Sequence, residues 1–199
     1  MTNTNKNRLP ELLAPAGTPQ AAAAAIAGGA DAIYAGLPAF NARMMAENFT
    51  RETFTETFEL CREYGVKVYA VVNTLVKDGE LADAMETLAY LNDLGIDGVI
   101  IQDPGLIRLA RLVFPDLKLQ VSTQLTVYGI DGVRFFEKLG FTRAVMPREM
   151  SIAEAGRIRA RSDIEIKIFG HGALCYAYSG QCRFSSALGT RSGNRGRCA

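Results

Sequence analysis

Short apolar runs recur along the chain, and most are followed by a polar turn and a stretch with helical periodicity. The runs lie at residues 12–16, 32–36, 67–73, 98–102, 118–124, 143–147 and 165–169. Most of them are continuously apolar rather than alternating, which is typical of strands covered on both faces of a parallel sheet. The intervening segments predict helices at 19–27, 51–64, 80–94, 105–113, 129–139 and 152–161.

Residues at the helix boundaries support this division. Glycine follows four of the predicted helices at the position where a left-handed turn costs least, namely at Gly29, Gly65, Gly95 and Gly140. Ser151 and Glu154 have the spacing of a capping box at the start of the last helix. Asp103, directly before Pro104, fits an N-cap with proline at the first helical position.

Strands that alternate with helices, without a hairpin signal, predict a parallel α/β fold. The candidates are a (β/α)8 barrel and an open doubly wound sheet. The first strand–helix turn, at 16–19, lacks the G-x-G-x-x-G phosphate loop. We therefore predict a TIM-barrel-like (β/α)8 domain over residues 1–169, continued by a cysteine-rich region at 170–199. Seven strands are one short of closure, which indicates truncation at the C-terminus.

Composition narrows the function only slightly. Lysine plus arginine number 22 against 21 aspartate plus glutamate, so net charge indicates neither nucleic acid nor a membrane as partner. The apolar runs are too short to span a bilayer, and the polar start lacks the apolar core of a signal peptide. We expect a cytoplasmic protein whose cysteines remain thiols.

Polar residues stand at the carboxyl ends of the predicted strands, where barrels of this kind carry their chemistry. We predict that six of them converge on one face as a pocket: Arg43, Asn73, Gln124, Arg148, Glu149 and His171. Arg148 and Glu149 face a ligand or form a surface pair. His171, the single histidine, ligates metal, transfers protons or only hydrogen-bonds a strand end. Glu11 precedes the first strand and belongs at the opposite end.

Three of the four cysteines, Cys175, Cys182 and Cys198, share one glycine- and serine-rich stretch. Their C-x6-C-x15-C spacing argues against a zinc knuckle, which favours shorter pairs, whereas a [4Fe–4S] cluster tolerates wide spacing. Cluster, zinc and no metal all remain open, with the cluster favoured. A fourth ligand is absent, so a missing C-terminal region or a partner chain would supply it. Cys61, in a helical stretch, is predicted to be inert packing.

The same stretch carries arginine without any acid from residue 183 onward. Arg191 and Arg195 lie between the second and third of these cysteines. Such a run is either a solvated loop or a site for an anion.

Taken together, the motifs resemble the collagenase-like peptidase family U32. The resemblance rests on Glu-Leu-Leu-Ala-Pro-Ala-Gly at 11–17, Gly-Ala-Asp-Ala-Ile-Tyr-Ala-Gly at 29–36, His-Gly-Ala-Leu-Cys at 171–175 and Tyr-Ser-Gly-Gln-Cys at 178–182. Asp103-Pro-Gly105, Ser122-Thr-Gln124 and Arg148-Glu149 extend it over nearly the whole chain.

The resemblance implies an oxygen-independent RNA hydroxylase that modifies C5 of a tRNA uridine or a 23S rRNA cytidine. It implies a [4Fe–4S] cluster on Cys175, Cys182 and Cys198, and a prephenate-like hydroxyl donor. Catalytic roles would fall to Arg148, Glu149 and His171, and substrate binding to Arg43, Asn73, Gln124, Arg191 and Arg195. The family name implies a peptidase instead, and an inactive fragment or scaffold is the third hypothesis.

Overall fold

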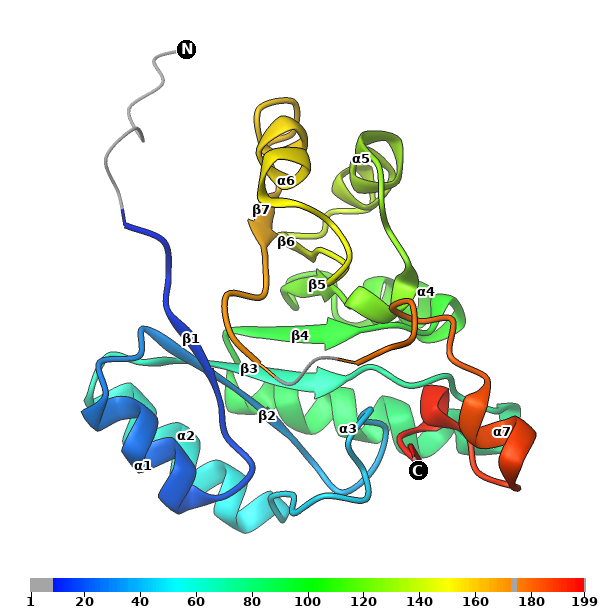
Figure 1. Ribbon diagram of the computed structural model, residues 1–199. Helices are drawn as coiled ribbons and strands as arrows, with labels where there is room; N and C mark the ends of the chain where they lie inside the picture. Colours follow the sequence, from blue (N-terminus) through cyan, green and yellow to red (C-terminus); the bar gives the residue numbers. More distant parts are fainter. Residues whose placement is uncertain (1–8, 173–174, 199) are drawn as a thin grey trace.

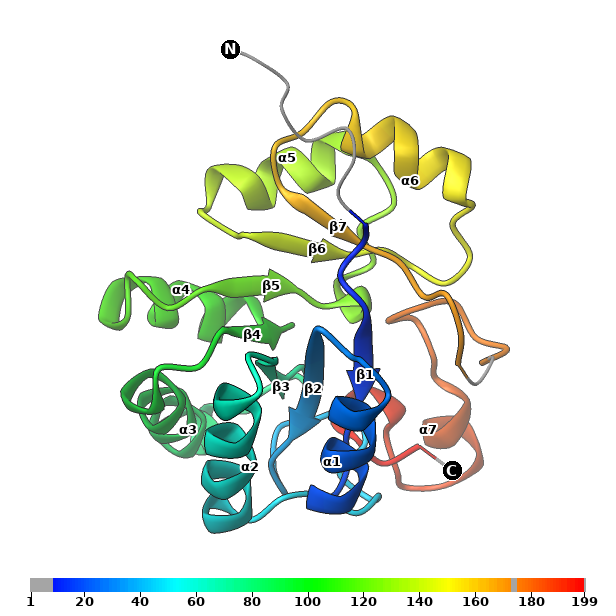
Figure 2. The ribbon, with the colours of Figure 1, turned by 90° about the vertical axis from the view of Figure 1, so that its left-hand side faces the viewer.

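The structure is a computed structural model that describes residues 9–172 and 175–198. Within these residues one sheet of seven parallel strands follows the chain order, each strand pairing with the next. Figures 1 and 2 show that this sheet curls into part of a barrel. The strands are β1 (Leu13–Pro15), β2 (Ala32–Gly36), β3 (Lys67–Val72), β4 (Gly98–Ile101), β5 (Leu119–Val121), β6 (Arg143–Val145) and β7 (Glu165–Lys167).

Helices connect successive strands and lie on the outer, convex side of the sheet (Figure 1). They are α1 (Pro19–Ala27), α2 (Arg51–Glu63), α3 (Leu81–Leu94), α4 (Pro104–Val113), α5 (Ile130–Lys138) and α6 (Ile152–Arg159). Three short 3₁₀ turns, η1 (Asp78–Glu80), η2 (Thr123–Leu125) and η3 (Gly193–Arg195), and the helix α7 (Phe184–Leu188) complete the described elements. No helix in the described ranges is long and apolar enough to cross a bilayer.

The predicted fold class is confirmed. Strand order 1 to 7 excludes the doubly wound arrangement, in which the first strand is central. Each predicted strand is present, and the bounds of the six predicted helices agree to within two residues. In the described structure β1 pairs only with β2 and β7 only with β6, so both edges of the sheet are open. The short helix α7 was not predicted.

The local signals explain this agreement. The four predicted helix-ending glycines all have positive φ, between 69° and 82°. The Ser151 hydroxyl accepts the N–H of Glu154, and a carboxylate oxygen of Glu154 accepts the N–H of Ser151 at 2.9 Å. Asp103 caps α4 by accepting the N–H of Leu106 at 2.8 Å. These contacts need only neighbouring residues, so the sequence alone reveals them.

The strands bury both faces, but in two different environments. On β4, Val99 and Ile101 pack outward in the large core that includes the helices. Ile100 between them points into the barrel, where it packs with Tyr69 and Val145. Two apolar environments on opposite faces account for the continuous apolar runs in the sequence.

A charged cluster lies at the amino ends of the strands. The carboxylate of Glu11 accepts hydrogen bonds from Lys67 Nζ at 2.8 Å and from Arg143 Nη1 at 2.7 Å. Arg143 also donates to Glu165 and lies 4.7 Å from the centre of the Tyr69 ring. The predicted place of Glu11, at the end of the barrel opposite the candidate site, is therefore confirmed.

Candidate functional site

The six predicted pocket residues all lie in segments that follow the carboxyl ends of the strands. These residues follow five different strands: Arg43 follows β2, Asn73 follows β3, Gln124 lies in η2 after β5, Arg148 and Glu149 follow β6, and His171 follows β7. In parallel strands these ends share one side of the sheet, which is the catalytic side of barrels.

Asn73 connects two of these segments. Its Oδ1 accepts the N–H of Ala42 at 2.8 Å, and its Nδ2 donates to Ser122 Oγ at 3.4 Å. The loop after β2 is thereby held against the ends of β3 and β5. The backbone N–H of Arg43 donates to Asn41 Oδ1 at 2.7 Å, and Arg43 as a whole is exposed.

Glu149 is anchored to the cysteine segment, by which we mean residues 175–198. Its Oε1 accepts the N–H of Ser179 at 2.7 Å, and its Oε2 accepts the hydroxyl of Tyr128 at 3.0 Å. Partial burial raises the pKa of Glu149, but hydrogen bonds from the backbone, Ser179 and Tyr128 outweigh it and leave that pKa below its ordinary value. Partial burial and the Glu149 carboxylate raise the pKa of Tyr128 to about 12. Glu149 is therefore an ionised anchor.

Arg148, the neighbour of Glu149, also contacts the cysteine segment. Its Nη2 donates to the backbone carbonyl of Ala177 at 3.1 Å. Its Nε is buried and has no hydrogen-bond partner among the described residues. One N–H of this guanidinium thus remains available for an acceptor that a ligand would bring.

Two glycines let the cysteine segment approach the strand ends closely. A Cβ at Gly180 would lie 2.2 Å from the carbonyl oxygen of Gln124, and a Cβ at Gly196 would lie 2.2 Å from that of Asn41. Both glycines also have positive φ, 79° and 75°. Any side chain at either position would push the segment away from the loops on which it rests.

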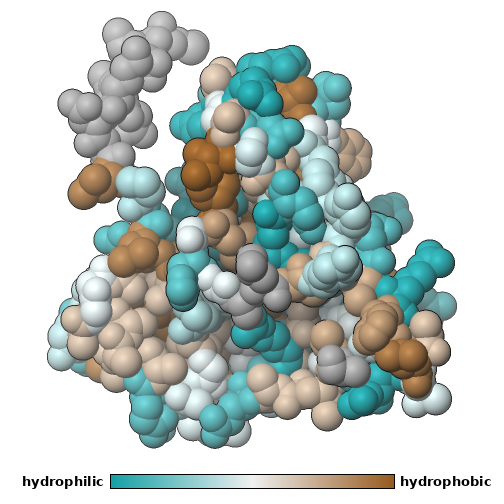
Figure 3. Space-filling model, in the orientation of Figure 1, coloured by the Kyte–Doolittle hydropathy of each residue, from teal (hydrophilic) through white to brown (hydrophobic). Residues whose placement is uncertain are grey.

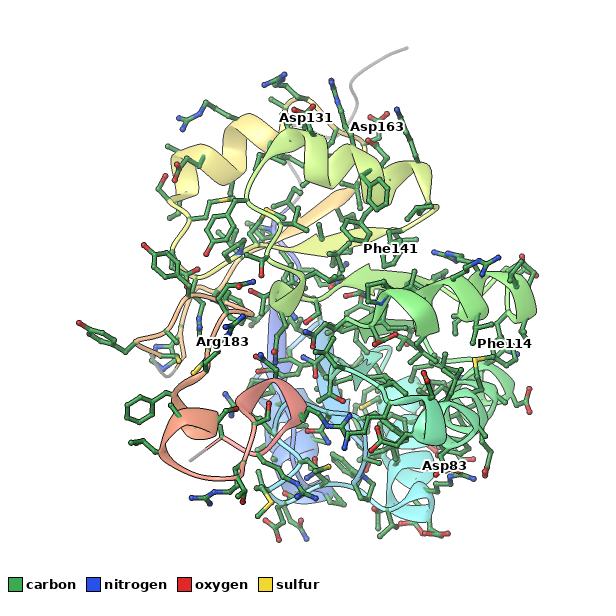
Figure 4. The ribbon with its side chains drawn as sticks, turned by 90° about the vertical axis from the view of Figure 1, so that its right-hand side faces the viewer. Asp83, Phe114, Asp131, Phe141, Asp163 and Arg183 are labelled. Carbon is green, nitrogen blue, oxygen red and sulfur yellow. The ribbon has the colours of Figure 1, made fainter. Side chains whose placement is uncertain are left out.

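The arginines of the segment differ in their surroundings. Arg195 pairs with Glu80, with Nη1 to Oε2 at 2.9 Å, and donates to the carbonyl of Leu75 at 3.0 Å. This pairing lowers the pKa of Glu80 to about 2. Arg191 is exposed, as is Arg183, which Figure 4 shows on the loop that precedes α7. Arg195 thus fixes the segment to η1, whereas Arg191 and Arg183 face solvent.

The three clustered cysteines all lie on this side of the molecule. Cys175 and Cys198 are exposed and Cys182 is half-buried, and none of them forms a disulfide. Three thiols on glycine-containing loops are donors suited to an iron–sulfur cluster. In the described ranges, however, no three Cys, His, Asp or Glu side chains lie close enough together to hold a metal. Cys61 is fully buried in α2, as predicted.

Two contributors were not predicted as site residues. Ser179, only 2% exposed, donates its N–H to the Glu149 carboxylate, and the hydroxyl of Tyr128 donates to the other carboxylate oxygen. Ser179 lies in the quoted Tyr-Ser-Gly-Gln-Cys motif, which is the one sequence signal that could have revealed it. Tyr128 has no comparable signal, because its role depends on a residue 21 positions away.

Comparison with known proteins gives consistent results. The profile of peptidase family U32 matches residues 17–199. The chain is 39% identical over 190 residues to tRNA hydroxylation protein P of Escherichia coli, covering 95% of this chain and 42% of that protein. It is also 39% identical to a 23S rRNA 5-hydroxycytidine synthase of Escherichia coli, covering 95% of this chain and 28% of that protein.

A third relative and a solved structure extend the comparison. The chain is 32% identical to a protein named collagenase from Porphyromonas gingivalis, covering 95% of this chain and 48% of that protein. The U32 peptidase Mk0906 has the same fold, with a TM-score of 0.66 at 18% identity, over 84% of this chain and 71% of that chain.

The chain spans less than half the length of these curated relatives. The profile match, by contrast, takes in every strand after β1 and the whole cysteine segment. The chain belongs to peptidase family U32.

Proposed function

We propose that this chain forms the catalytic barrel of an RNA hydroxylase that replaces C5–H of a pyrimidine by C5–OH without molecular oxygen. The observation that carries this proposal is the contact between Glu149 and Ser179. It anchors the cysteine segment at the carboxyl ends of the strands, where barrel enzymes have their active sites. The names of two relatives at 39% identity, one of tRNA hydroxylation and one of rRNA hydroxycytidine synthesis, support it.

In this proposal Cys175, Cys182 and Cys198 would bind a [4Fe–4S] cluster once their loops bring the three thiols together. These cysteines lie on loops that follow the last strand, whereas Cys61 is fully buried within α2 and is packed among apolar side chains. The fourth ligand comes from a region or partner outside this chain. When bound, the cluster supplies one-electron redox chemistry.

The arginines at the mouth bind the hydroxyl donor. Replacement of a C–H by a C–OH bond requires a donor that supplies one oxygen atom and accepts two electrons. A prephenate-like carboxylate fits Arg148, whose buried Nε–H has no partner among the described residues, and the exposed Arg43. Asn73, directly after β3, and Gln124, in η2, lie at the same mouth and bind substrate there.

Exposed side chains at the mouth are assigned the acid–base and phosphate-binding roles. His171 is exposed after β7 and is the group that takes the proton released from C5. Glu149 is already engaged by Ser179 and Tyr128, so it positions the cysteine segment. Arg191 is exposed and binds RNA phosphate, whereas Arg195 contributes its charge while paired with Glu80.

The proposal is tested by comparing two cysteine variants. Protein purified without air should show the visible absorbance of an iron–sulfur cluster, and nucleoside mass spectrometry of RNA should show one added oxygen. Cys182→Ser should remove both signals, whereas Cys61→Ser should keep both. Hydroxylation retained by Cys182→Ser would disprove the role of the cluster.

Peptidase activity is the alternative that the relative named collagenase raises. Ser179, the serine of the Tyr-Ser-Gly-Gln-Cys motif, is buried and bound to Glu149, so it is not placed as a nucleophile. Gelatin hydrolysis unaffected by Cys182→Ser, together with unmodified RNA, would favour the peptidase.

A further inference from the structure

Two glutamines with unsatisfied acceptors face the interior of the barrel. Gln102, directly after β4, is 5% exposed, and Gln120, in β5, is 2% exposed. In each, the side-chain oxygen Oε1 is buried without a hydrogen-bond donor among the described residues. A buried acceptor without a partner destabilises a fold, so such a group needs an explanation.

Strand register places Gln102 at the mouth. Val72, Ile101 and Val121 are aligned neighbours on β3, β4 and β5. The next residues on these strands are Asn73, Gln102 and Ser122, which therefore stand side by side at the carboxyl ends.

Alternation along the strands gives the direction of these three side chains. Val72, Ile101 and Val121 belong to the outer core, whereas Ile100 belongs to the inner one. Successive side chains of a strand point to opposite faces, so Asn73, Gln102 and Ser122 point inward. The hydrogen bond from Asn73 to Ser122 joins β3 and β5 across the position of Gln102.

Gln120 lies one step deeper. It is aligned with Ile100, whereas Gln102 follows the end of β4, two residues after Ile100. Its Nε2 would lie 2.9 Å from a Cβ added at Gly98, so its carboxamide packs against the backbone of β4. The two glutamines thus share chemistry and burial but differ in depth.

The row Asn73, Gln102 and Ser122 is uncharged, and its unsatisfied atom is an acceptor. A carboxylate donor cannot supply the hydrogen that Gln102 Oε1 lacks, whereas Arg148 and Arg43 offer it charged N–H donors. A pyrimidine base brings an N–H, from N3 of uracil or from the amino group of cytosine. Enzymes that modify a base place it in a pocket and read its edge through such hydrogen bonds.

We propose that Gln102 is a specificity-determining residue whose Oε1 accepts an N–H from the pyrimidine base to be hydroxylated. This inference rests on the proposed function and names the part of the site that receives the base. Asn73 and Ser122 flank the base edge, and the arginines receive the hydroxyl donor separately.

The test replaces each glutamine by methionine, which has similar length and no acceptor oxygen. Gln102→Met should lower hydroxylation, measured as 5-hydroxyuridine and 5-hydroxycytidine in RNA, by about 10- to 100-fold. Its thermal midpoint should stay the same or rise, because an unsatisfied acceptor has been removed. Gln120→Met should show the same stability change with hydroxylation unchanged. The two nucleosides distinguish uracil from cytosine as the natural ligand.

A binding measurement separates this inference from the proposed function. Single-stranded RNA with one target pyrimidine is compared with the same RNA lacking that base. The wild-type protein should bind the RNA with the base more tightly, and Gln102→Met should reduce that preference about tenfold. Full hydroxylation or an unchanged preference in Gln102→Met would overturn the inference, as would an equal loss in Gln120→Met. A different outcome would contradict only the hydroxylase proposal. In that outcome the wild-type protein leaves the RNA unmodified but still shows the Gln102-dependent binding preference.

Discussion

The backbone N–H of Ser179 donates to Glu149 Oε1 at 2.7 Å and joins the end of β6 to the cysteine segment 30 residues later. The Ser179 hydroxyl lies 3.2 Å from the other carboxylate oxygen, so one residue uses both of its donors on one anchor. This contact holds the segment that carries Cys182 against the strand ends. The integrity of the candidate site therefore depends on the charge state of Glu149.

Acid should release this anchor. The pKa of Glu149 is lowered in the folded protein, so its contribution to stability is complete above the ordinary carboxyl value of 4.5. That contribution is lost as pH falls through the lowered, folded-state value. Hydrogen exchange of the Ser179 amide should accelerate, relative to amides in β3, only below this range. Glu149→Gln should show reduced protection already at neutral pH, and equal protection in both proteins would contradict the anchor.

The close approach of Gly180 and Gly196 gives a second prediction. Gly180→Ala and Gly196→Ala should each release the cysteine segment, since a Cβ would lie 2.2 Å from a backbone oxygen and both residues have positive φ. Limited proteolysis should then cleave within 175–198 faster than in the parent protein. Gly193→Ala is the matched control, because its Cβ would meet no atom within 4 Å among the described residues. Cleavage at equal rates in all three would show that the segment is not held there.

The pairing of Arg195 with Glu80 should stabilise the same segment modestly. Both side chains are about a third exposed, at 30% and 33%, and such pairs contribute below about 1 kcal/mol. Because the pKa of Glu80 is lowered to about 2, this contribution is present above the ordinary value of 4.5 and disappears toward pH 2. A double-mutant cycle with Arg195→Met and Glu80→Gln measures it by urea unfolding. A coupling energy of zero at neutral pH would show that the pairing of Arg195 with Glu80 contributes nothing to stability.

Features determined by neighbouring residues could be predicted from the sequence, and features determined by distant pairs could not. The caps at Ser151 and Asp103 involve residues three positions apart, and both were predicted. The contact of Arg195 with Glu80 spans 115 positions, so no local pattern reveals that this arginine is paired.

The same limit applies to the surface of the cysteine segment. Its high glycine content suggested loops, yet α7 forms and leaves Phe184 and Leu188 exposed. Figure 3 shows the corresponding hydrophobic area over α7. A five-residue helix has too few positions for a periodic pattern, so its apolar residues gave no helical signal.

The last prediction concerns the charged cluster at the opposite end of the barrel. The Arg143 side chain is 9% exposed and pairs with both Glu11 and Glu165. Arg143→Met should destabilise the protein by about 1–3 kcal/mol, because Glu11 loses one charged partner but keeps Lys67 and Tyr69 in the described cluster. Urea unfolding measures this loss.

Two controls separate a lost pair from a stranded charge. Glu165→Gln should cost below about 1 kcal/mol, because the Glu165 side chain is 63% exposed. The double variant Glu11→Leu with Arg143→Met should recover much of the stability lost in Arg143→Met, since it removes the carboxylate as well as its partner. If the double variant were as unstable as Arg143→Met, the loss would come from packing against Tyr69, over which the guanidinium lies, and not from the charge of Glu11.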